Sequence, residues 1–327
     1  ATINNPSSKE EIAEALKTAL EMPCEEQVRR NRIMQNRLRR YSLSRWATDF
    51  LEQLISMKQA PTGSSVKLLN VRAKSELLLR YHRSARRLFL LDYDGTLVGF
   101  VARPELAKPT RELCAILSAL AADSRNKVIL TSGRDKGTLQ DWFGSLGLGL
   151  VAEHGAWIKE GGQDWEMSQP LACDWKPKLL PILDKYADRL PGAFVEEKEF
   201  SVSWHYRGAD PLQGRVVARE LADHLLTFTS NIDVQILQGN KVVEVRNAGV
   251  NKGTITRRWL ATGHDFMLAI GDDVTDEDTF AVLPDDAYSI CVGIGQTRAR
   301  FNLREPGEVL ELLTELLDTS SNAQRLP

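Results

Sequence analysis

Beyond about residue 80, short runs of apolar residues alternate with longer segments in which apolar positions recur every three or four residues. The short runs have no helical period, which predicts buried parallel strands. The longer segments are typical of amphipathic helices that cover such strands. We therefore expect an α/β sheet with strands near 87–92, 127–131, 149–153, 266–271 and 287–292, and with helices near 109–122, 135–143 and 252–262.

Between about residues 157 and 247 the order of the predicted elements changes, because strands now come in consecutive pairs that are separated by helices. The expected strands lie near 194–197, 200–207, 233–237 and 241–246, and the expected helices near 176–190 and 213–228. Consecutive strands joined by short turns pair antiparallel. This stretch is therefore predicted to be an α+β insertion with an antiparallel sheet.

Residues 1–60 are predicted to be helical. Ser7 to Glu10 have capping-box spacing, an apolar face follows, Pro23 ends this helix, and a second amphipathic helix surrounds Trp46. The predicted domains are a helical segment (1–60), a linker (61–83), an α/β core (84–156 and 247–320), the insertion (157–246) and a C-terminal tail (321–327).

Composition excludes several classes of protein. The 327 residues are 43% hydrophobic and 26% charged, and the formal net charge of −2 gives no global field for nucleic acid or anionic lipid. The arginines between residues 29 and 40 alternate with Glu, Asn and Gln, so we interpret them as a solvated helix face. No apolar run has membrane-spanning length, and no signal peptide is visible. The four cysteines are far apart, which suits a reducing compartment. We therefore expect a cytoplasmic protein without membrane or nucleic-acid partners.

The strand predicted at 87–92 ends in two carboxylates, Asp92 and Asp94, followed by Gly95 and Thr96. Two acids at a strand end are costly to bury without a cation or a proton between them. A carboxylate can attack phosphorus and form an aspartyl-phosphate, while a neighbouring acid protonates the leaving oxygen. The pair therefore indicates phosphoryl transfer.

Two further segments offer groups that bind phosphate. The second predicted strand ends at Thr131 and is followed by Ser132, Gly133 and Arg134. The hydroxyl and backbone N–H groups of this segment can hold a phosphate oxygen. Ser132 is the preferred hydroxyl ligand, and Thr131 is also acceptable. Lys252 opens a predicted helix, where its charge and the helix N-terminus both favour an anion.

Another predicted strand ends in a carboxylate cluster that suits a metal ion. Asp272 is the best ligand candidate, together with the Asp92 carboxylate and the backbone carbonyl of Asp94, and Asp273 is a candidate for contact through water. Asp276 is equally well explained as a metal neighbour or as an acid in the first turn of a helix. Hard oxygen ligands favour Mg²⁺, for which Mn²⁺ can substitute.

In their order along the chain, these motifs resemble those of the haloacid dehalogenase (HAD) phosphatase superfamily. The resemblance implies a Rossmann-like parallel core with an inserted α+β cap of the C2 type. It also implies that Asp92 is the nucleophile and Asp94 the acid/base. The phosphate-binding residues that it implies are Ser132, Gly133, Arg134 and Lys252.

A narrower resemblance, over about residues 80–315, is to the trehalose-6-phosphate phosphatases. It is carried by the motif G-D-D-x-T-D-E-D-x-F and by the segments Arg87–Leu97, Ala152–Ala156, Glu196–Arg207 and Lys241–Val245. It implies hydrolysis of trehalose 6-phosphate, the last step of trehalose biosynthesis. The residues implied to bind the distal glucose are Glu196, Lys198 and Glu244, with His154 as a further candidate.

The N-terminal segment resembles the end of a trehalose-6-phosphate synthase domain, in Asn5-Pro6, Glu10–Leu16, Glu21–Pro23 and Trp46–Leu51. About 60 residues cannot form the sugar-nucleotide site of that large enzyme, so no synthase activity is expected. We expect a fragment or a reduced descendant of a synthase–phosphatase fusion, with a synthase domain or subunit as a possible partner.

Three alternatives stay open at this point. The substrate can be another glycosyl phosphate, such as glucosylglycerol phosphate or sucrose phosphate, because only the cap distinguishes sugars. The chain can be a non-catalytic regulatory module of a synthase fusion, against which the intact acidic and basic motifs argue. A mutase that shares the aspartyl-phosphate step is the third.

Overall fold

The computed structural model describes residues 13, 16–18, 20–40, 66–101, 103–229 and 232–323. The chain divides into two compact units, residues 1–64 and residues 65–327. In the first unit, helix α2 (Cys24–Arg40) begins directly after Pro23, and its Glu26 pairs with Arg29 and Arg30 at 2.6 and 2.7 Å. The helices predicted to begin near Ser7 and around Trp46 fall largely outside the described residues.

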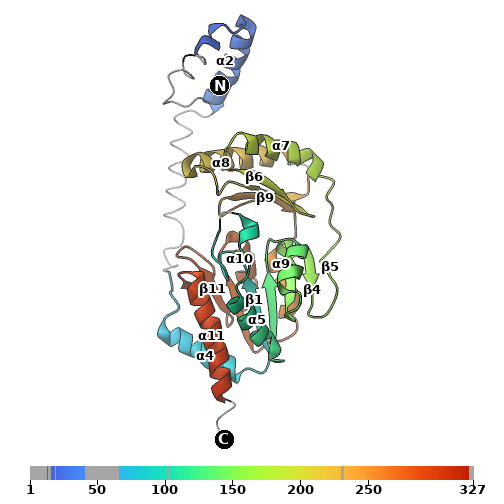
Figure 1. Ribbon diagram of the computed structural model, residues 1–327, viewed down its shortest axis with the longest axis vertical. Helices are drawn as coiled ribbons and strands as arrows, with labels where there is room; N and C mark the ends of the chain where they lie inside the picture. The colour runs from blue at the N-terminus through green and yellow to red at the C-terminus, as the bar shows by residue number, and fades with distance from the viewer. Residues whose placement is uncertain are drawn as a thin grey trace. The chain divides into compact units, whose positions relative to one another are not determined.

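The second unit is built on an eight-stranded sheet with β1 near its centre (Figure 1). The strand order is β12-β11-β10-β1-β2-β3-β4-β5, parallel from β12 to β3 and antiparallel beyond it. The bounds are β1 (Arg87–Asp92), β2 (Asn126–Thr131), β3 (Gly149–Ala152), β4 (Trp157–Lys159), β5 (Glu166–Met167), β10 (Phe266–Gly271), β11 (Tyr288–Val292) and β12 (Phe301–Leu303). The predicted parallel α/β sheet is therefore confirmed.

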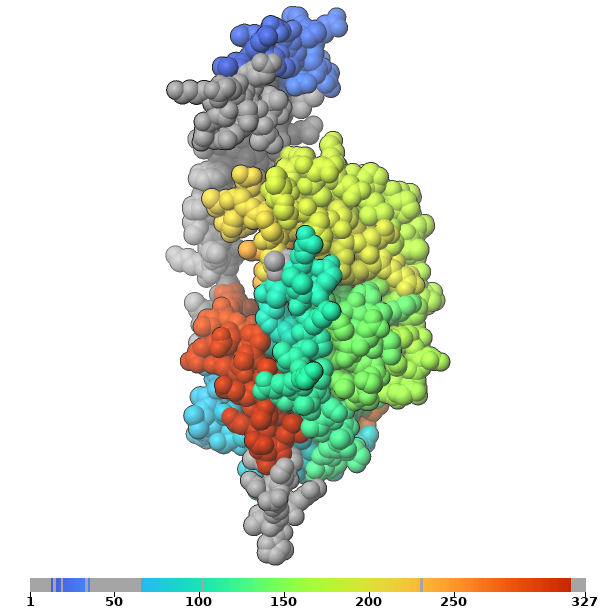
Figure 2. All heavy atoms as spheres, viewed as in Figure 1, coloured from blue at the N-terminus to red at the C-terminus, as the bar shows by residue number. Residues whose placement is uncertain are grey.

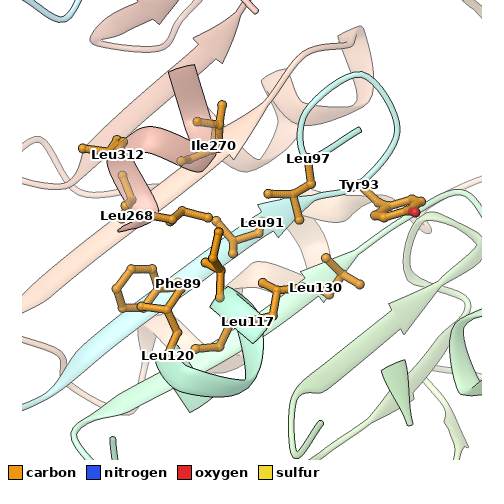
Figure 3. Close-up of a cluster of buried hydrophobic side chains, with 14 of the residues drawn as sticks. Phe89, Leu91, Tyr93, Leu97, Leu117, Leu120, Leu130, Leu268, Ile270 and Leu312 are labelled. Atoms are coloured by element: carbon orange, nitrogen blue, oxygen red, sulfur yellow. The ribbon is translucent and has the colours of Figure 1, made fainter. Parts of the chain in front are cut away.

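Helices cover both faces of this sheet. They are α4 (Val71–Arg83), α5 (Arg111–Ala122), α6 (Lys136–Phe143), α9 (Lys252–Leu260), α10 (Val274–Phe280) and α11 (Pro306–Ala323), with the short 3-10 turns η1 (Pro104–Leu106) and η2 (Glu153–Gly155). Successive residues of β1 point to opposite faces. Phe89 and Leu91 pack against α5 and α11 (Figure 3), whereas Leu88 and Leu90 pack against Ile255 and Trp259 of α9. Burial on both faces explains the uninterrupted apolar run of this strand.

The insertion forms a cap with its own antiparallel sheet, in the order β6-β7-β9-β8. Its strands are β6 (Phe194–Glu197), β7 (Ser201–His205), β8 (Val234–Gly239) and β9 (Val242–Asn247), and its helices are α7 (Lys176–Asp188) and α8 (Pro211–Phe228). Trp204, Val243 and Val245 bury one face of the sheet against α7 and α8. The opposite face is turned toward the core (Figure 1) and carries polar residues such as Ser203 and Glu244, which line a cavity there. This arrangement confirms the predicted α+β insertion.

Two segments differ from the domain ranges expected from the sequence. Helix α4 occupies the second half of the stretch 61–83, which was expected to be a linker, because its Leu77 and Tyr81 are buried in the core. Strands β4 and β5 lie in the stretch assigned to the insertion, yet they extend the core sheet through antiparallel pairing with β3. None of the described helices is long and apolar enough to cross a membrane.

Candidate active site

The parallel register of the sheet brings the acidic motifs to one edge. Leu91 of β1 pairs with Ile270 of β10, and Asp92 pairs with Thr131 of β2. Because the carboxyl ends of parallel strands meet at the same edge of a sheet, Asp92, Ser132 and Asp272 emerge next to one another. This edge faces the polar side of the cap.

Lys252 links two buried carboxylates at this edge. Its Nζ donates to Asp92 Oδ1 at 2.5 Å and to Asp276 Oδ1 at 2.8 Å, and all three side chains are buried. Lys252 is the first residue of α9, whose N-terminus is capped by the Asn251 side chain. The other oxygen of Asp276 accepts the backbone N–H of Asp273 as part of a capping box at the start of α10.

Asp272 completes a group of three carboxylates. Oxygens of Asp92, Asp272 and Asp276 all lie within 4.8 Å of one another. Burial, reinforced by Asp276 and Asp94 and opposed by Lys252, raises the pKa of Asp92 to about 7. Burial and the charges of Asp92 and Asp276 raise the pKa of Asp272 to about 9. Asp92 and Asp272 are thus held where a cation is needed to keep them ionised, with the Asp276 carboxylate beside them.

Gly95 makes room for this group. Its φ of +88° lies in the left-handed region, and a Cβ at this position would lie 2.2 Å from Asp272 Oδ2. The next residue, Thr96, donates its hydroxyl to Asp272 Oδ1 at 3.3 Å. The turn after β1 therefore allows Asp272 to approach, and no side chain larger than hydrogen fits there.

The donor set suits a hard divalent cation. Carboxylate oxygens from two strand ends and from the first turn of α10 are the ligand type that Mg²⁺ prefers. Asp273, which the sequence named as a candidate for metal contact through water, lies outside this group of three and accepts the N–H of Val274 at 2.7 Å with one carboxylate oxygen. Asp276, left undecided by the sequence, lies within the cluster because it is the third residue of α10 and points back toward Lys252.

Asp94 is held apart from the cluster by Arg134. The guanidinium donates to both carboxylate oxygens of Asp94, at 2.9 and 2.6 Å. It stacks on the Trp142 ring, with 4.6 Å from Cζ to the ring centroid, and also lies over Tyr93. A bidentate, aromatic-backed arginine fixes the direction of the carboxylate. Arg134, expected to bind phosphate, is thus engaged with the second aspartate.

The residues that follow β2 form a tight turn beside the acids. Ser132 Oγ accepts the N–H of Arg134 at 3.1 Å, and Thr131 Oγ1 donates to the Leu91 carbonyl at 3.5 Å. A Cβ on Gly133 would lie 2.4 Å from His154 Nε2. Gly133 therefore leaves room for the His154 ring beside its backbone, and both residues line the cavity.

Polar residues of the cap face this edge across the cavity. Glu196 accepts from His205 Nε2 at 2.8 Å and lies 3.3 Å from Lys198 Nζ. Burial opposes ionisation of Glu196, but His205 and Lys198 outweigh it and lower its pKa to about 2. Glu244 of β9 lies 3.1 Å from Nε2 of the core residue His154. Burial alone would raise the pKa of Glu244, but His154 and Lys198 hold it below its usual range.

One cavity joins both groups of residues. The predicted site residues that line it are Asp92, Asp94, Gly133, Arg134, His154, Glu196, Lys198, Glu244, Lys252, Asp272 and Asp273, with Asp276 beside them. Ser132 is not among the lining residues because its side chain is buried in the turn. The cavity thus connects the carboxylate–lysine cluster of the core with the charged face of the cap.

Similarity to known protein families identifies the family of this chain. A family model described as trehalose-phosphatase matches residues 90–300, which include all of the residues named above. The chain belongs to the trehalose-phosphatase family. The resemblance inferred from the motifs is thereby confirmed.

Relatives of this family member are known from sequence and structure. A bifunctional trehalose-6-phosphate synthase/phosphatase of Thermoproteus tenax is 40% identical over 97% of the chain, and a trehalose-phosphatase of Saccharomyces cerevisiae is 32% identical over 96%. The chain spans only 44% and 40% of these two proteins. The C-terminal domain of C. albicans trehalose-6-phosphate phosphatase matches 79% of the chain and 99% of that domain, with 35% identity and a TM-score of 0.73.

Sequence reasoning missed the part of the cavity wall that follows β1 in this trehalose-phosphatase family member. Phe100 and Val101 line the cavity, and the guanidinium of Arg207 on the cap stacks on the Phe100 ring at 4.5 Å. This loop and η1 reach the cap (Figure 2). The sequence contained one indication of this wall, because Phe100 and Val101 form an apolar pair in the loop that follows the aspartate motif.

Proposed function

We propose that this chain hydrolyses trehalose 6-phosphate to trehalose and phosphate through an aspartyl-phosphate intermediate. One observation carries the proposal: a single cavity joins a carboxylate–lysine cluster suited to phosphoryl transfer with a charged cap surface suited to sugar hydroxyls. Relatives that are named for the same reaction support the choice of substrate.

Asp92 is the proposed nucleophile. Its carboxylate oxygen bonds to phosphorus while the bond from phosphorus to the sugar oxygen breaks. Lys252, 2.5 Å away, lowers the pKa of Asp92 and so favours its ionised form, and it stabilises negative charge on the phosphoryl oxygens. Further proposed donors to these oxygens are the backbone N–H groups around Gly133, which lines the cavity, and the Ser132 hydroxyl after release from its turn.

Asp94 is the proposed acid/base. It gives its proton to the departing sugar oxygen, then takes a proton from the water that attacks the aspartyl-phosphate and frees Asp92. The bidentate contact with Arg134 fixes the direction of its carboxylate. Arg134 therefore contributes to orientation of the acid as well as to the charge near the phosphate.

The chain's acids would hold Mg²⁺ beside this pair. The proposed ligands are the carboxylates of Asp92 and Asp272 and the backbone carbonyl of Asp94, with Asp276 adjacent and Asp273 in contact through water. Bound Mg²⁺ would supply positive charge to the phosphoryl oxygens and to the crowded carboxylates. The raised pKa values of Asp92 and Asp272 support this assignment, because burial has assembled acids that need a cation.

The cap provides the proposed specificity for the sugar. Glu196, Lys198 and Glu244 have no part in the phosphoryl chemistry, yet they are held in ionised form over the cavity. Glu244 Oε1 is buried without a hydrogen-bond partner among the described residues, which leaves an acceptor for a hydroxyl group. Fixed donors and acceptors discriminate against a sugar that leaves them unpaired.

Phosphate release from a panel of substrates tests the proposal. The panel contains trehalose 6-phosphate, sucrose 6-phosphate, glucosylglycerol phosphate and p-nitrophenyl phosphate, each assayed with magnesium and with EDTA. We expect magnesium-dependent turnover with trehalose 6-phosphate strongly preferred. Comparable rates on several sugars contradict the specificity, absence of turnover indicates a regulatory module, and an isomerised sugar phosphate indicates a mutase.

Variants of the cap locate the specificity. Because truncating one member of a buried hydrogen-bonded pair costs about 1–3 kcal/mol, Glu244→Gln is expected to lower kcat/KM for trehalose 6-phosphate by about 10- to 100-fold. Hydrolysis of p-nitrophenyl phosphate is expected to be unchanged. Glu220→Gln, on the outer helix α8, is the matched control and is expected to affect neither substrate.

The proposed partner is a trehalose-6-phosphate synthase domain or subunit that supplies the substrate. The fusion named for both activities in Thermoproteus tenax supports this pairing.

The described cysteines Cys24, Cys114, Cys173 and Cys291 are all free thiols, which suits the reducing conditions of a cytoplasmic location.

A further inference from the structure

Two adjacent residues of the core adopt a backbone conformation that residues with a Cβ rarely take. Glu153 and His154, in η2 directly after β3, have φ angles of +46° and +55°. Such a conformation is unfavourable and persists where the surrounding contacts enforce it, often at functional sites. It directs both side chains at the cap: His154 toward Glu244, and Glu153 toward the loop between β6 and β7.

The Glu153 carboxylate binds the backbone of that loop with both oxygens. Oε2 accepts the N–H of Phe200 at 2.8 Å, and Oε1 accepts the N–H of Glu199 at 3.3 Å. Glu153 is only 3% exposed, so water does not compete for these bonds. A buried carboxylate is tolerated only with partners of this kind, and here both partners belong to the cap.

Lys198 directly precedes the two residues that Glu153 holds. Its N–H donates to the Ser201 carbonyl at 2.9 Å, and its own carbonyl accepts from Lys176 Nζ at 2.7 Å. The backbone of Lys198 is therefore tied to the cap on one side and, through Glu199 and Phe200, to the core on the other. Its side chain is 10% exposed, with the ammonium 3.3 Å from Glu196, so a shift of this backbone would move the ammonium within the cavity.

Other contacts press the same loop onto the core without directing its backbone. Phe200 packs against Ala156 and Val250, and Glu199 pairs with Lys136 at 2.9 Å in a half-exposed ion pair. Apolar packing is not directional, and an exposed ion pair adds little. Among the described contacts between this loop and the core, the two hydrogen bonds to Glu153 are thus the ones that fix the loop backbone in direction.

We propose that Glu153 is a positioning residue, which holds Lys198 in place for the sugar of the substrate while the cap covers the core. The inference rests on the proposed function, because that function assigns Lys198 to the sugar. Glu153 acts on Lys198 through the loop and through its own negative charge, and it touches neither Asp92 nor Lys252 within hydrogen-bonding distance. Its loss is therefore expected to weaken sugar recognition and to leave phosphoryl transfer intact.

The test compares Glu153→Gln with the wild type on two substrates. The amide of the new side chain has one acceptor oxygen in place of two. Its NH₂ group then faces the second backbone N–H, so that two donors oppose each other. We expect kcat/KM for trehalose 6-phosphate to fall by about 10- to 100-fold, mainly through KM, because small displacements of a binding group cost this much. Hydrolysis of p-nitrophenyl phosphate is expected to stay within about twofold, which also reports that the core is folded.

A double-mutant cycle shows whether the effect passes through Lys198. Lys198→Ala alone is expected to lower trehalose 6-phosphate turnover, and adding Glu153→Gln is expected to cause little further loss. Glu199→Gln is the matched control, because it removes the ion pair with Lys136 and keeps both backbone N–H groups. The control is expected to match the wild type on both substrates.

Any of three results overturns the inference. The first two are unchanged kinetics of Glu153→Gln on trehalose 6-phosphate, and an equal loss of kcat/KM on both substrates. The third is a double variant whose loss of activity equals the product of the losses in Glu153→Gln and Lys198→Ala. If Glu153→Gln does not fold, Glu153→Asp replaces it, because the shorter side chain keeps the charge and draws the carboxylate away from both backbone donors; the same criteria then apply. Wild-type protein that hydrolyses p-nitrophenyl phosphate but no trehalose 6-phosphate overturns the proposed function, and this inference with it.

Discussion

Replacing Lys252 by methionine is the most informative single change, because this lysine touches two of the three clustered carboxylates. Methionine approximates the aliphatic part of the lysine side chain and removes the charged amine. The lost contacts are those to Asp92 at 2.5 Å and to Asp276 at 2.8 Å, all between groups that are almost completely buried. Removing one partner of a buried ion pair typically destabilises a protein by about 3–5 kcal/mol, since the remaining charges lose their compensation.

The destabilisation caused by Lys252→Met is expected to depend on pH. Lys252 lowers the pKa of Asp92, which burial raises to about 7 even with the lysine present. Without the lysine the pKa of Asp92 in the folded state rises further above its value in the unfolded chain. An acid with a raised folded-state pKa favours folding at low pH, and that contribution is lost as the pH rises through the folded-state pKa. The deficit should therefore be larger at pH 8 than at pH 5.

Two measurements on magnesium-free protein and one on turnover check this reasoning. Chemical unfolding at pH 5 and pH 8 gives the two stability deficits, and phosphate release with magnesium is expected to fall by about 10²–10³-fold or more. Lys127→Met is the matched control, because Lys127 pairs with Glu160 at 2.7 Å but is 38% exposed, so its loss should cost about 0–1 kcal/mol. Equal deficits in the two variants, or a larger Lys252→Met deficit at pH 5, would refute the assigned electrostatics.

Three further outcomes are expected. Asp92→Asn should abolish phosphate release while the protein still unfolds cooperatively; turnover at the wild-type rate excludes Asp92 as nucleophile. Gly95→Ala should lower magnesium affinity, measured by titration, by about tenfold or more, because its Cβ would lie 2.2 Å from an Asp272 oxygen at a φ of +88°. Gly99→Ala is the control and should leave the affinity unchanged, because a Cβ there has nothing within 4 Å. Equal affinities of the two variants would speak against Asp272 as a ligand. Magnesium at 100 times its Kd should raise the free energy of unfolding by about 2.7 kcal/mol over EDTA-treated protein, and the absence of any shift in thermal melting with Mg²⁺ or Mn²⁺ would contradict a metal at Asp92 and Asp272.

Much of the fold was predictable because the local patterns agree with the packing. The run ending in Asp92 was expected as a strand over 87–92 and is β1 with those bounds, since both of its faces are buried and no helical period competes. The cap strands were expected because consecutive strand pairs alternate with helices along the chain, and in the structure one face of their sheet packs on α7 and α8. Helix α4 was missed because its apolar stripe is narrow, with Leu77 and Tyr81 as its fully buried residues, and follows a Gly- and Ser-containing stretch.

The sequence by itself determined the chemistry of the site. It supplies the carboxylates, the lysine and the small turn residues, and it places them at or near strand ends. Tertiary structure alone decided how they pair. Asp276 rather than Asp273 joins the carboxylate cluster, because the first turn of α10 rotates one toward Lys252 and uses the other as a cap. Arg134 turns to Asp94, and Glu153 reaches the cap loop from a left-handed backbone, because partners about 40 residues away lie beside them only after the sheet and cap have formed. Such pairings depend on long-range geometry, and local patterns in a chain contain no record of it.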